Sequence, residues 1–336
     1  MTVIPHAVTA GREVVDEAMR AAVERLDPRM RRVCAYHFGW VDADGAPTTA
    51  GGKALRPALA LLSGRAAGAD TASTVPAAVA VEFVHAFSLL HDDVMDNDRM
   101  RRHRPSAWTV FGVPAAILAG DALLALAEEV LLDLGTAGSA RAARCLASTT
   151  RRLIAGQALD LGFESRQDVT LEECTVMSLD KTSALFACAC TLGAVLCEAP
   201  TRLALALAGF GSDLGLAFQL VDDLLGIWGR TEVTGKPVLS DLRSRKKSLP
   251  VTAALNAGTP ASRRLAALYA QPDPLSEPQL VEAAALVEEA GGRAWAEATA
   301  DKRIALAEAQ LATAEVPVAV REEFMAVARF VTARDC

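Results

Sequence analysis

The chain has 336 residues, of which 51% are hydrophobic and 5% aromatic, and its formal net charge is -7 at pH 7. A protein whose main partner is nucleic acid needs an excess of Lys and Arg on one face, so this charge argues against nucleic acid. A chain of this length can bury a large core, and a single domain over residues 1–336 is expected because no linker-like tract or repeat interrupts it.

Helical periodicity recurs along most of the chain. An amphipathic helix is predicted over 8–26, followed by a Gly- and Pro-containing segment over 42–52 and a helix that begins near residue 53. Further helices are predicted over 76–96, 114–134, 139–161, 171–196 and 202–228, with Ser139 as the N-cap of the third of these. A loop is expected over 229–247, and helices resume from residue 250. Because no strand-rich region is visible, the sequence predicts an all-α fold.

The chain carries no sequence feature typical of export or of a membrane span. Its first ten residues lack a basic region followed by an apolar run. The apolar stretches 115–132 and 203–221 are interrupted by polar residues or glycine, and a spanning helix needs about 20 apolar residues. We therefore expect no membrane span and a cytoplasmic location.

Two clusters of aspartates each close an apolar helix. Asp92 and Asp96 are four residues apart and fall on one helical face, with Asp93 beside them. The second cluster, Asp222 and Asp223, follows Gln219. Carboxylates one turn apart repel each other unless a cation compensates them. Oxygen ligands of this kind suit Mg²⁺, whereas zinc and di-iron sites need Cys, His or Glu-x-x-His patterns that neither cluster has.

Basic residues accompany both acidic clusters. A diphosphate is held directly by cationic side chains and, through divalent cations, by carboxylates, so both signs of charge are needed together. The candidate cations are Lys53 and Arg56, Arg101 and Arg102, Lys181 beside Thr182, and Lys236 and Lys246. Each would be an ordinary surface charge if it stood alone, and their grouping around the clusters indicates a diphosphate site.

These residues resemble the motifs of the trans-prenyl diphosphate synthases over roughly residues 51–250. The matching segments are Gly51-Gly52-Lys53-Ala54-Leu55-Arg56-Pro57, Asp92-Asp93-Val94-Met95-Asp96 with Arg101-Arg102, Lys181-Thr182, Phe218-Gln219, Asp222-Asp223, Gly235-Lys236-Pro237 and Lys246. His103 stands where that family usually has Gly. The resemblance implies a single isoprenoid synthase domain, an all-α helical bundle around a central active-site cavity, and a homodimer.

The resemblance also assigns a role to each matching residue. It implies that the diphosphate of isopentenyl diphosphate is held by Lys53, Arg56, His85 and Arg102. It implies contacts to the allylic substrate from Arg101, Lys181, Thr182, Gln219, Lys236 and Lys246. The principal Mg²⁺ ligands would be Asp92, Asp96 and Asp222, supported by Asp93 and Asp223, with three Mg²⁺ ions in each active site.

The expected reaction condenses an allylic diphosphate (dimethylallyl, geranyl or farnesyl) with isopentenyl diphosphate to give a short all-trans product. In the family, bulky residues just before the first aspartate motif set the floor of the product tunnel. Phe87 and Ser88 are the fifth and fourth residues before Asp92. A single aromatic in this place resembles synthases of the C20 product, geranylgeranyl diphosphate, whereas two aromatics would indicate C15. Phe87 as an ordinary core residue remains the alternative.

The second motif departs from the family pattern, because Gly226 occupies the place of the usual third aspartate. Two rival functions stay open. A class I terpene cyclase of the same fold would ionise an allylic diphosphate without a second substrate, and it would not need Lys53, Arg56 and His85. A non-catalytic partner subunit of a synthase is the other rival, and Gly226 is the only residue that favours it.

Overall fold

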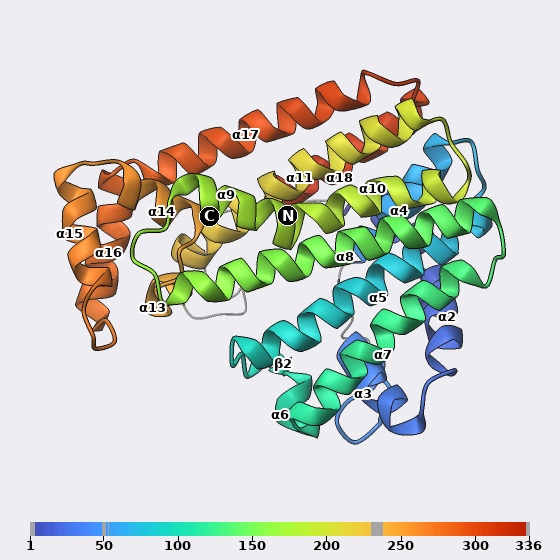
Figure 1. Ribbon diagram of the computed structural model, residues 1–336, viewed down its shortest axis with the longest axis horizontal. Helices are drawn as coiled ribbons and strands as arrows, with labels where there is room; N and C mark the ends of the chain where they lie inside the picture. The colour runs from blue at the N-terminus through green and yellow to red at the C-terminus, as the bar shows by residue number, and fades with distance from the viewer. Residues whose placement is uncertain (1–3, 49–51, 53, 230–237, 334–336) are drawn as a thin grey trace.

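The computed structural model describes residues 4–48, 52, 54–229 and 238–333, and this part of the chain is almost entirely helical (Figure 1). The predicted all-α fold is confirmed. Lys53 and Lys236 lie outside the described residues, so their expected roles stay predictions.

The helices before the first acidic cluster are α1 (His6–Thr9), α2 (Arg12–Val23), α3 (Pro28–Phe38), α4 (Leu55–Ala66) and α5 (Thr71–Met95). A short hairpin of β1 (Met100–Arg101) and β2 (Arg104–Pro105) follows, and then come α6 (Ala107–Phe111), α7 (Val113–Leu132), α8 (Ala137–Glu164) and α9 (Leu171–Ser178). A π-helical turn η1 (Leu179–Ser183) leads into α10 (Ala184–Leu196) and α11 (Thr201–Trp228). The C-terminal helices are α13 (Ser240–Arg243), α14 (Leu249–Asn256), α15 (Pro260–Tyr269), α16 (Glu277–Glu289), α17 (Gly292–Leu311) and α18 (Val318–Thr332).

Four helices, α4, α5, α10 and α11, form the centre of the bundle. α10 packs against the other three, α17 runs along α11, and α7 and α8 cover α5 and α10. Helices that are apolar on most sides have to be surrounded by other helices, and these four have that composition. Phe83, Phe186 and Phe210 are fully buried among them. The acidic ends of α5 and α11 are thereby carried by helices at the buried centre of the fold.

A second apolar cluster lies where α11 meets the helices α13 to α16. Ile227 at the end of α11 and Leu242 in α13 are both fully buried in it. Figure 1 shows α15 and α16 at one end of the molecule, far from α2 and α3. The cluster fixes α13 against the end of α11, just beyond the second acidic cluster.

Several predicted boundaries differ from the structure because local signals outweigh periodicity. The helix predicted over 8–26 is broken into α1 and α2 by Gly11, which has a φ of +79° that L side chains rarely adopt. Ser139 is not the N-cap of α8. The N-cap is Thr136, and Ser139 returns a hydrogen bond as the third helical residue of a capping box.

Two other predictions missed short elements. The helix predicted over 171–196 is interrupted by η1, and the loop predicted over 229–247 contains α13. The β1–β2 hairpin was not expected either. Its two-residue loop, Arg102 and His103, has φ values of +52° and +61°, as the tight turns that match strand twist require.

Three helical segments are long and apolar enough to span a membrane by length and composition alone. They are Thr71–Met95, Leu171–Leu196 and Thr201–Trp228. Most of each apolar window is covered by the rest of the protein, with 72%, 67% and 56% of the window buried. Their hydrophobicity is therefore used mainly in packing against other helices.

Candidate active site

The first acidic cluster closes α5 with two carboxylates on one face. Burial raises the pKa of Asp92 to about 6, while the Lys181 ammonium acts in the opposite direction. The pKa of Asp96 is also raised by burial, and Lys181 again opposes the shift. Ionisation of both carboxylates is therefore unfavourable until a cation lies close to them, as expected for residues that bind a cation.

Asp93 points away from that face and binds Arg101. The Arg101 Nε donates to Asp93 Oδ1 at 2.8 Å, and its Nη2 donates to the same oxygen. Only 2% of the Asp93 side chain is exposed. Asp93 therefore lies behind the face that carries Asp92 and Asp96, where it holds Arg101 and the β1–β2 hairpin against the end of α5.

The second acidic cluster is tied into a chain of hydrogen bonds. Thr182 Oγ1 donates to Gln219 Oε1 at 2.6 Å, and Gln219 Nε2 donates to Asp223 Oδ1 at 2.8 Å. The other Asp223 oxygen accepts from the Leu249 backbone N–H at 2.8 Å. Burial raises the pKa of Asp223 to about 7. Asp223 is thus buried behind the cluster, while Asp222 on the same turn is exposed.

The π-helical turn η1 carries Lys181 and Thr182 into the centre of the bundle. Single π-turns inside helices recur at functional sites because they rotate side chains out of the regular register. Two glycines let neighbouring helices press against this turn. A Cβ at Gly156 of α8 would lie 2.3 Å from the backbone nitrogen of Lys181, and one at Gly215 of α11 would lie 2.6 Å from Ser183 Cα.

Asp160 belongs to the site, although its role was not recognised in the sequence. Its Oδ2 lies 2.5 Å from the Lys181 ammonium, and the two side chains are only 18% and 20% exposed. Asp160 also faces Asp92 and Asp96, since it raises the pKa of both. The one available signal was Asp160 and Glu164, an acidic pair one turn apart at the end of α8, which repeats the spacing of Asp92 and Asp96.

Gln157, one turn before Asp160, is a second residue that sequence reasoning missed. It is only 5% exposed, and within the described residues neither amide atom has a hydrogen-bond partner. Buried amide groups are almost always satisfied by protein, water or a ligand. Gln157 therefore has both a donor and an acceptor left for a molecule in the site.

Arg56 and His85 form a hydrogen-bonded pair, and the seven-residue spacing puts His85 two turns before Asp92 on the same face of α5. Arg56 Nη1 lies 3.1 Å from His85 Nε2, and because guanidinium only donates, His85 Nε2 accepts and the ring is neutral. Burial, followed by the charges of Arg56 and Arg102, holds the pKa of His85 well below its usual value. The Arg56 guanidinium also stacks 4.6 Å from the Phe186 ring centroid.

Arg102 reaches the same region from the hairpin. A Cβ at Gly52 would lie 2.8 Å from the Arg102 guanidinium carbon, so the Arg102 guanidinium lies directly against the backbone at Gly52. Glu82, which sequence reasoning also missed, faces Arg102 and Arg56, and burial raises its pKa. The structure thus brings three of the predicted basic side chains, Arg56, His85 and Arg102, close to each other.

Arg102 and the aspartates line different cavities. A cavity of about 400 Å³ is lined by Gly52, Glu82 and Arg102 together with residues of α2 and α3. A second cavity, of about 530 Å³, is lined by Asp96, Asp160, Asp241 and Lys246, among others. In Figure 1 the end of α5, the C-terminal end of α8 and α13 lie on the same side of the molecule.

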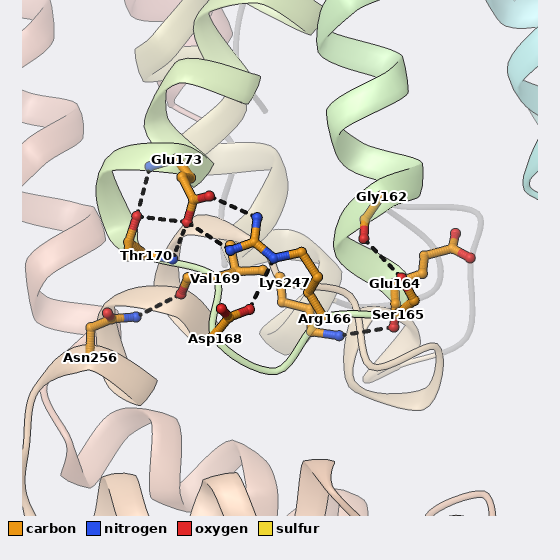
Figure 2. A network of polar contacts seen from close by, with 10 residues as sticks. All are labelled: Gly162, Glu164, Ser165, Arg166, Asp168, Val169, Thr170, Glu173, Lys247 and Asn256. Atoms are coloured by element: carbon orange, nitrogen blue, oxygen red, sulfur yellow. Dashed lines mark hydrogen bonds and ion pairs between the residues drawn. The ribbon is translucent and has the colours of Figure 1, made fainter.

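Lys246 enters the second cavity from the segment that follows α13. Burial alone would lower the pKa of Lys246, but the charges of Asp241, Asp223, Asp160 and Asp222 outweigh it and raise the pKa. Its neighbour Lys247 also lines this cavity, and Lys247 Nζ donates to the Glu164 carbonyl at 3.3 Å, as Figure 2 shows. The Lys247 carbonyl in turn accepts from Cys174 Sγ at 3.2 Å. The backbone bearing Lys246 is therefore pinned to α8 and α9.

The corner between α8 and α9 is itself held by a network of polar contacts (Figure 2). Arg166 binds Asp168 at 2.9 Å and Glu173 at 2.7 Å. Glu173 also caps α9 through Thr170, and Asn256 of α14 donates to the Val169 carbonyl at 3.1 Å. This corner gives the lysine-bearing segment a fixed support.

The donor set fits a hard divalent cation that is shared with a ligand. Within the described residues no three His, Cys, Asp or Glu side chains converge tightly enough to hold a metal by themselves. Mg²⁺ usually keeps several waters and binds a few carboxylates plus substrate phosphates, so a preformed protein cage is not expected. Asp92, Asp96 and Asp222 offer oxygen ligands only, and cationic side chains stand ready for the phosphates.

An all-α bundle that carries carboxylates at the ends of two central helices, facing lysines on a π-turn and a neighbouring segment, defines an isoprenoid synthase fold. Residues 45–287 match the family model described as polyprenyl synthetase, which covers more than half of the chain. The chain belongs to this family, whose members are trans-prenyl diphosphate synthases, and it is an enzyme that transfers prenyl groups.

Relatives of known activity agree with this assignment. The chain is 48% identical over 326 residues to (2E,6E)-farnesyl diphosphate synthase of Mycobacterium tuberculosis, covering 96% of this chain and 91% of the relative. It is 44% identical to geranylgeranyl diphosphate synthase of the same organism, covering 95% and 90% of the two chains. The chain is therefore similar in sequence to short-chain synthases.

Solved structures show the same fold. A polyprenyl synthetase from Streptomyces coelicolor matches with a TM-score of 0.93 and 52% identity, covering 97% of this chain and 99% of that one. A polyprenyl synthase from Caulobacter crescentus, crystallised with calcium and isoprenyl diphosphate, matches with a TM-score of 0.84 and 29% identity, covering 99% of both chains.

Proposed function

We propose that this protein condenses an allylic diphosphate with isopentenyl diphosphate and releases geranylgeranyl diphosphate, the C20 product. The observation that supports a reaction with two substrates is that the charged side chains form two groups. Asp96, Asp160 and Lys246 line one cavity, and a second group of Arg56, His85 and Arg102 lies about two turns earlier along α5. A cyclase that acts on one diphosphate would have no use for the second group.

The allylic diphosphate would bind in the cavity between α5, α8 and α13. Asp92, Asp96 and Asp222 would hold it through Mg²⁺, three ions per site, and when bound these cations would neutralise the diphosphate and stabilise it as a leaving group. Lys181 and Lys246 would contact its oxygens directly, and Arg101 would be held in place by Asp93.

Ionisation of the allylic diphosphate leaves a carbocation that the surrounding residues have to tolerate. The Thr182 hydroxyl donates a hydrogen bond to Gln219. The lone pairs of the Thr182 oxygen are therefore not used in that bond and can stabilise positive charge. Apolar residues of the central helices exclude water, which would otherwise quench the cation.

Isopentenyl diphosphate would be held by Arg56, His85 and Arg102, with Lys53 as a further predicted contact. His85 is neutral, so it can donate to the diphosphate through Nδ1–H while accepting from Arg56. The double bond then attacks the allylic carbon, a new C–C bond forms, and a proton passes to the released diphosphate.

Product length is proposed from the residues before the first aspartate motif. Phe87 is buried, and its ring meets the His91 ring at 4.8 Å in an edge-on arrangement, whereas Ser88 is small. One aromatic in this place supports C20. The farnesyl diphosphate synthase relative at 48% identity supports C15 instead, and this is the second candidate product.

A homodimer is also part of the proposal. Exposed apolar side chains lie on α7 and α8, which pack against each other, and a partner copy would cover them. They are Val113, Ile117, Leu118, Ile154 and Leu159. We further propose a single domain and a cytoplasmic location, where soluble diphosphate substrates would be supplied.

Product analysis with each allylic primer tests this function. Purified protein with Mg²⁺ and isopentenyl diphosphate should convert dimethylallyl, geranyl and farnesyl diphosphate to a C20 product. Equal turnover without isopentenyl diphosphate would indicate a cyclase, and no turnover with any primer would indicate a silent subunit. A product that stops at C15 would select the second candidate.

A further inference from the structure

Helix α8 runs alongside η1 and α10 in the opposite direction, and the backbones are in close contact at two places (Figure 1). A Cβ on Gly138 would lie 2.2 Å from the Leu196 carbonyl oxygen, and one on Gly156 would lie 2.3 Å from the backbone nitrogen of Lys181. Only glycine, which has no Cβ, permits such an approach. The part of α8 between these two contacts is therefore held close to α10.

Two ion pairs show the same register between these helices. Arg152 Nη2 of α8 lies 2.7 Å from Asp180 Oδ1 of η1. Arg141 Nη2 of α8 lies 3.0 Å from Glu198 Oε1, just after the end of α10. Residues of α8 that follow Arg141 by one turn therefore lie opposite the middle of α10.

Cys145, one turn after Arg141, meets Cys188 of α10 at that place. The Cys188 thiol donates a hydrogen bond to Cys145 Sγ, and the Thr149 hydroxyl of α8 also bonds to the Cys188 thiol. A disulfide needs Cβ atoms about 3.8 Å apart. Two thiols that already touch between closely packed helices need only a small adjustment to reach that geometry.

The two thiols differ in exposure and in acidity. Cys145 is partly exposed, whereas Cys188 is only 2% exposed. The hydrogen bond from Cys188 lowers the pKa of Cys145, although burial opposes the shift. The same contact, followed by burial, raises the pKa of Cys188 well above its usual value. Because the thiolate is the nucleophile, Cys145 is the thiol that an oxidant reaches and that reacts first.

We propose that Cys145 and Cys188 are an oxidation site, at which a hydroperoxide converts the two thiols to a reversible disulfide between α8 and α10. The Cys145 thiolate attacks a peroxide oxygen, the O–O bond breaks, and Cys145 becomes a sulfenic acid as hydroxide leaves. The Cys188 sulfur then attacks the Cys145 sulfur, the S–O bond breaks, and the Cys188 proton leaves with the hydroxyl group as water. Two thiols and one hydrogen peroxide thus give one disulfide and two waters, and a small dithiol reverses the oxidation.

The bridge changes the position of Lys181, which lies seven residues before Cys188. An S–S bond is about 2.0 Å long, shorter than a hydrogen-bond contact between thiols, so α10 is drawn towards α8. At Gly156 the two backbones already touch, so this approach has to shift η1. Oxidation therefore disturbs the contact between Lys181 and Asp160 and lowers turnover, a consequence that rests on the proposed function.

Peptide mapping after oxidation tests the site. The reduced protein is treated with hydrogen peroxide, its free thiols are blocked with N-ethylmaleimide, and the non-reduced digest is analysed by mass spectrometry. A peptide pair linked through Cys145 and Cys188 is expected, and dithiothreitol should separate it. Cys197 is the internal control, because it is also partly exposed but burial raises its pKa. The absence of a linked pair, or oxidation of Cys197 as fast as Cys145, would refute the proposal.

Two variants separate the steps. Cys188→Ala should stop the reaction at the sulfenic acid, which dimedone traps on Cys145. Turnover of the oxidised wild type should fall about tenfold and recover with dithiothreitol, whereas Cys145→Ser should be as active as the reduced wild type and insensitive to peroxide. An equal loss of turnover in Cys145→Ser would overturn the proposal. Mapping of the wild type needs neither variant to fold and no synthase activity, so failure of the proposed function is distinguished from failure of this inference.

Discussion

The Lys181 ammonium lies 2.5 Å from Asp160 Oδ2, so the lysine on the π-turn of one helix is positioned by a carboxylate on another. Both side chains are largely buried, and Gly156 lets α8 approach the turn closely enough for the pair to form. Asp160 therefore acts on the substrate through Lys181.

Asp160→Asn should lower kcat/KM for the allylic diphosphate by about 10- to 100-fold, since a displaced lysine no longer meets the diphosphate in the required geometry. KM for isopentenyl diphosphate should stay within about twofold, because its proposed site is built from Arg56, His85 and Arg102 and does not include Lys181. Steady-state kinetics with each substrate varied in turn measures the difference. An equal loss for both substrates would show that Asp160 only maintains the fold.

Asp92→Asn should raise the stability of the metal-free protein and lower its activity. Burial raises the pKa of Asp92 to about 6, so the ionised carboxylate is unfavourable in the metal-free fold at neutral pH. Removing the charge should stabilise the metal-free protein by about 1 kcal/mol, while turnover falls by about 10² to 10³ or more. Thermal unfolding in EDTA and turnover in Mg²⁺ are the two measurements. Wild-type turnover in this variant would refute its assignment as a cation ligand.

Phe87→Ala should lengthen the product beyond the wild-type chain, because removal of the ring deepens the tunnel below Ser88. Chromatography of the dephosphorylated products gives the chain lengths. Phe210→Leu, which removes an aromatic ring from the core where it packs 5.1 Å from Phe324, should leave product length unchanged. The same product from Phe87→Ala and wild type would make Phe87 an ordinary core residue.

His103→Gly should stabilise the β1–β2 hairpin. His103 has a φ of +61°, where a Cβ costs roughly 1 kcal/mol that glycine avoids. Because glycine also makes the unfolded chain more flexible, the net gain should be below about 1 kcal/mol. Chemical denaturation measures it, with His103→Ala as the control that keeps the Cβ and should show no gain. A loss of stability in His103→Gly would mean that the imidazole makes a contact worth more than the strain.

Stability should fall in acid partly because of His37. Burial, followed by the charges of Arg102, Arg101 and Arg104, lowers the pKa of His37 to about 3. Between that value and the ordinary value near 6.5, the unfolded chain binds a proton that the folded protein does not, so stability is lost as pH falls through this window. The slope should be at most about 1.4 kcal/mol per pH unit and smaller in practice, since His37 is only partly buried. Denaturation midpoints from pH 7 to pH 4 should depend less on pH in His37→Gln, and an unchanged dependence would rule His37 out.

Much of the fold could be predicted because its signals are local. The apolar runs that end in Asp92 and Asp222 predicted two central helices, and both are present as α5 and α11. Predictions failed where a single residue outweighed the periodicity, as at Gly11, or where neighbouring helices imposed a register, as at η1. A π-turn depends on what packs against it, and Gly156 and Gly215 lie far from it in the sequence.

The sequence by itself determined the chemistry of the site: oxygen ligands on two helix ends, cationic side chains nearby, and an apolar interior. Residue types and short spacings were sufficient for that, because charge and periodicity are properties of the chain. Only the tertiary structure decided which groups meet. It joined Lys181 to Asp160 and Arg56 to His85, and it set Asp241 against Gly226. These contacts depend on packing between distant segments, so no local pattern could have predicted them.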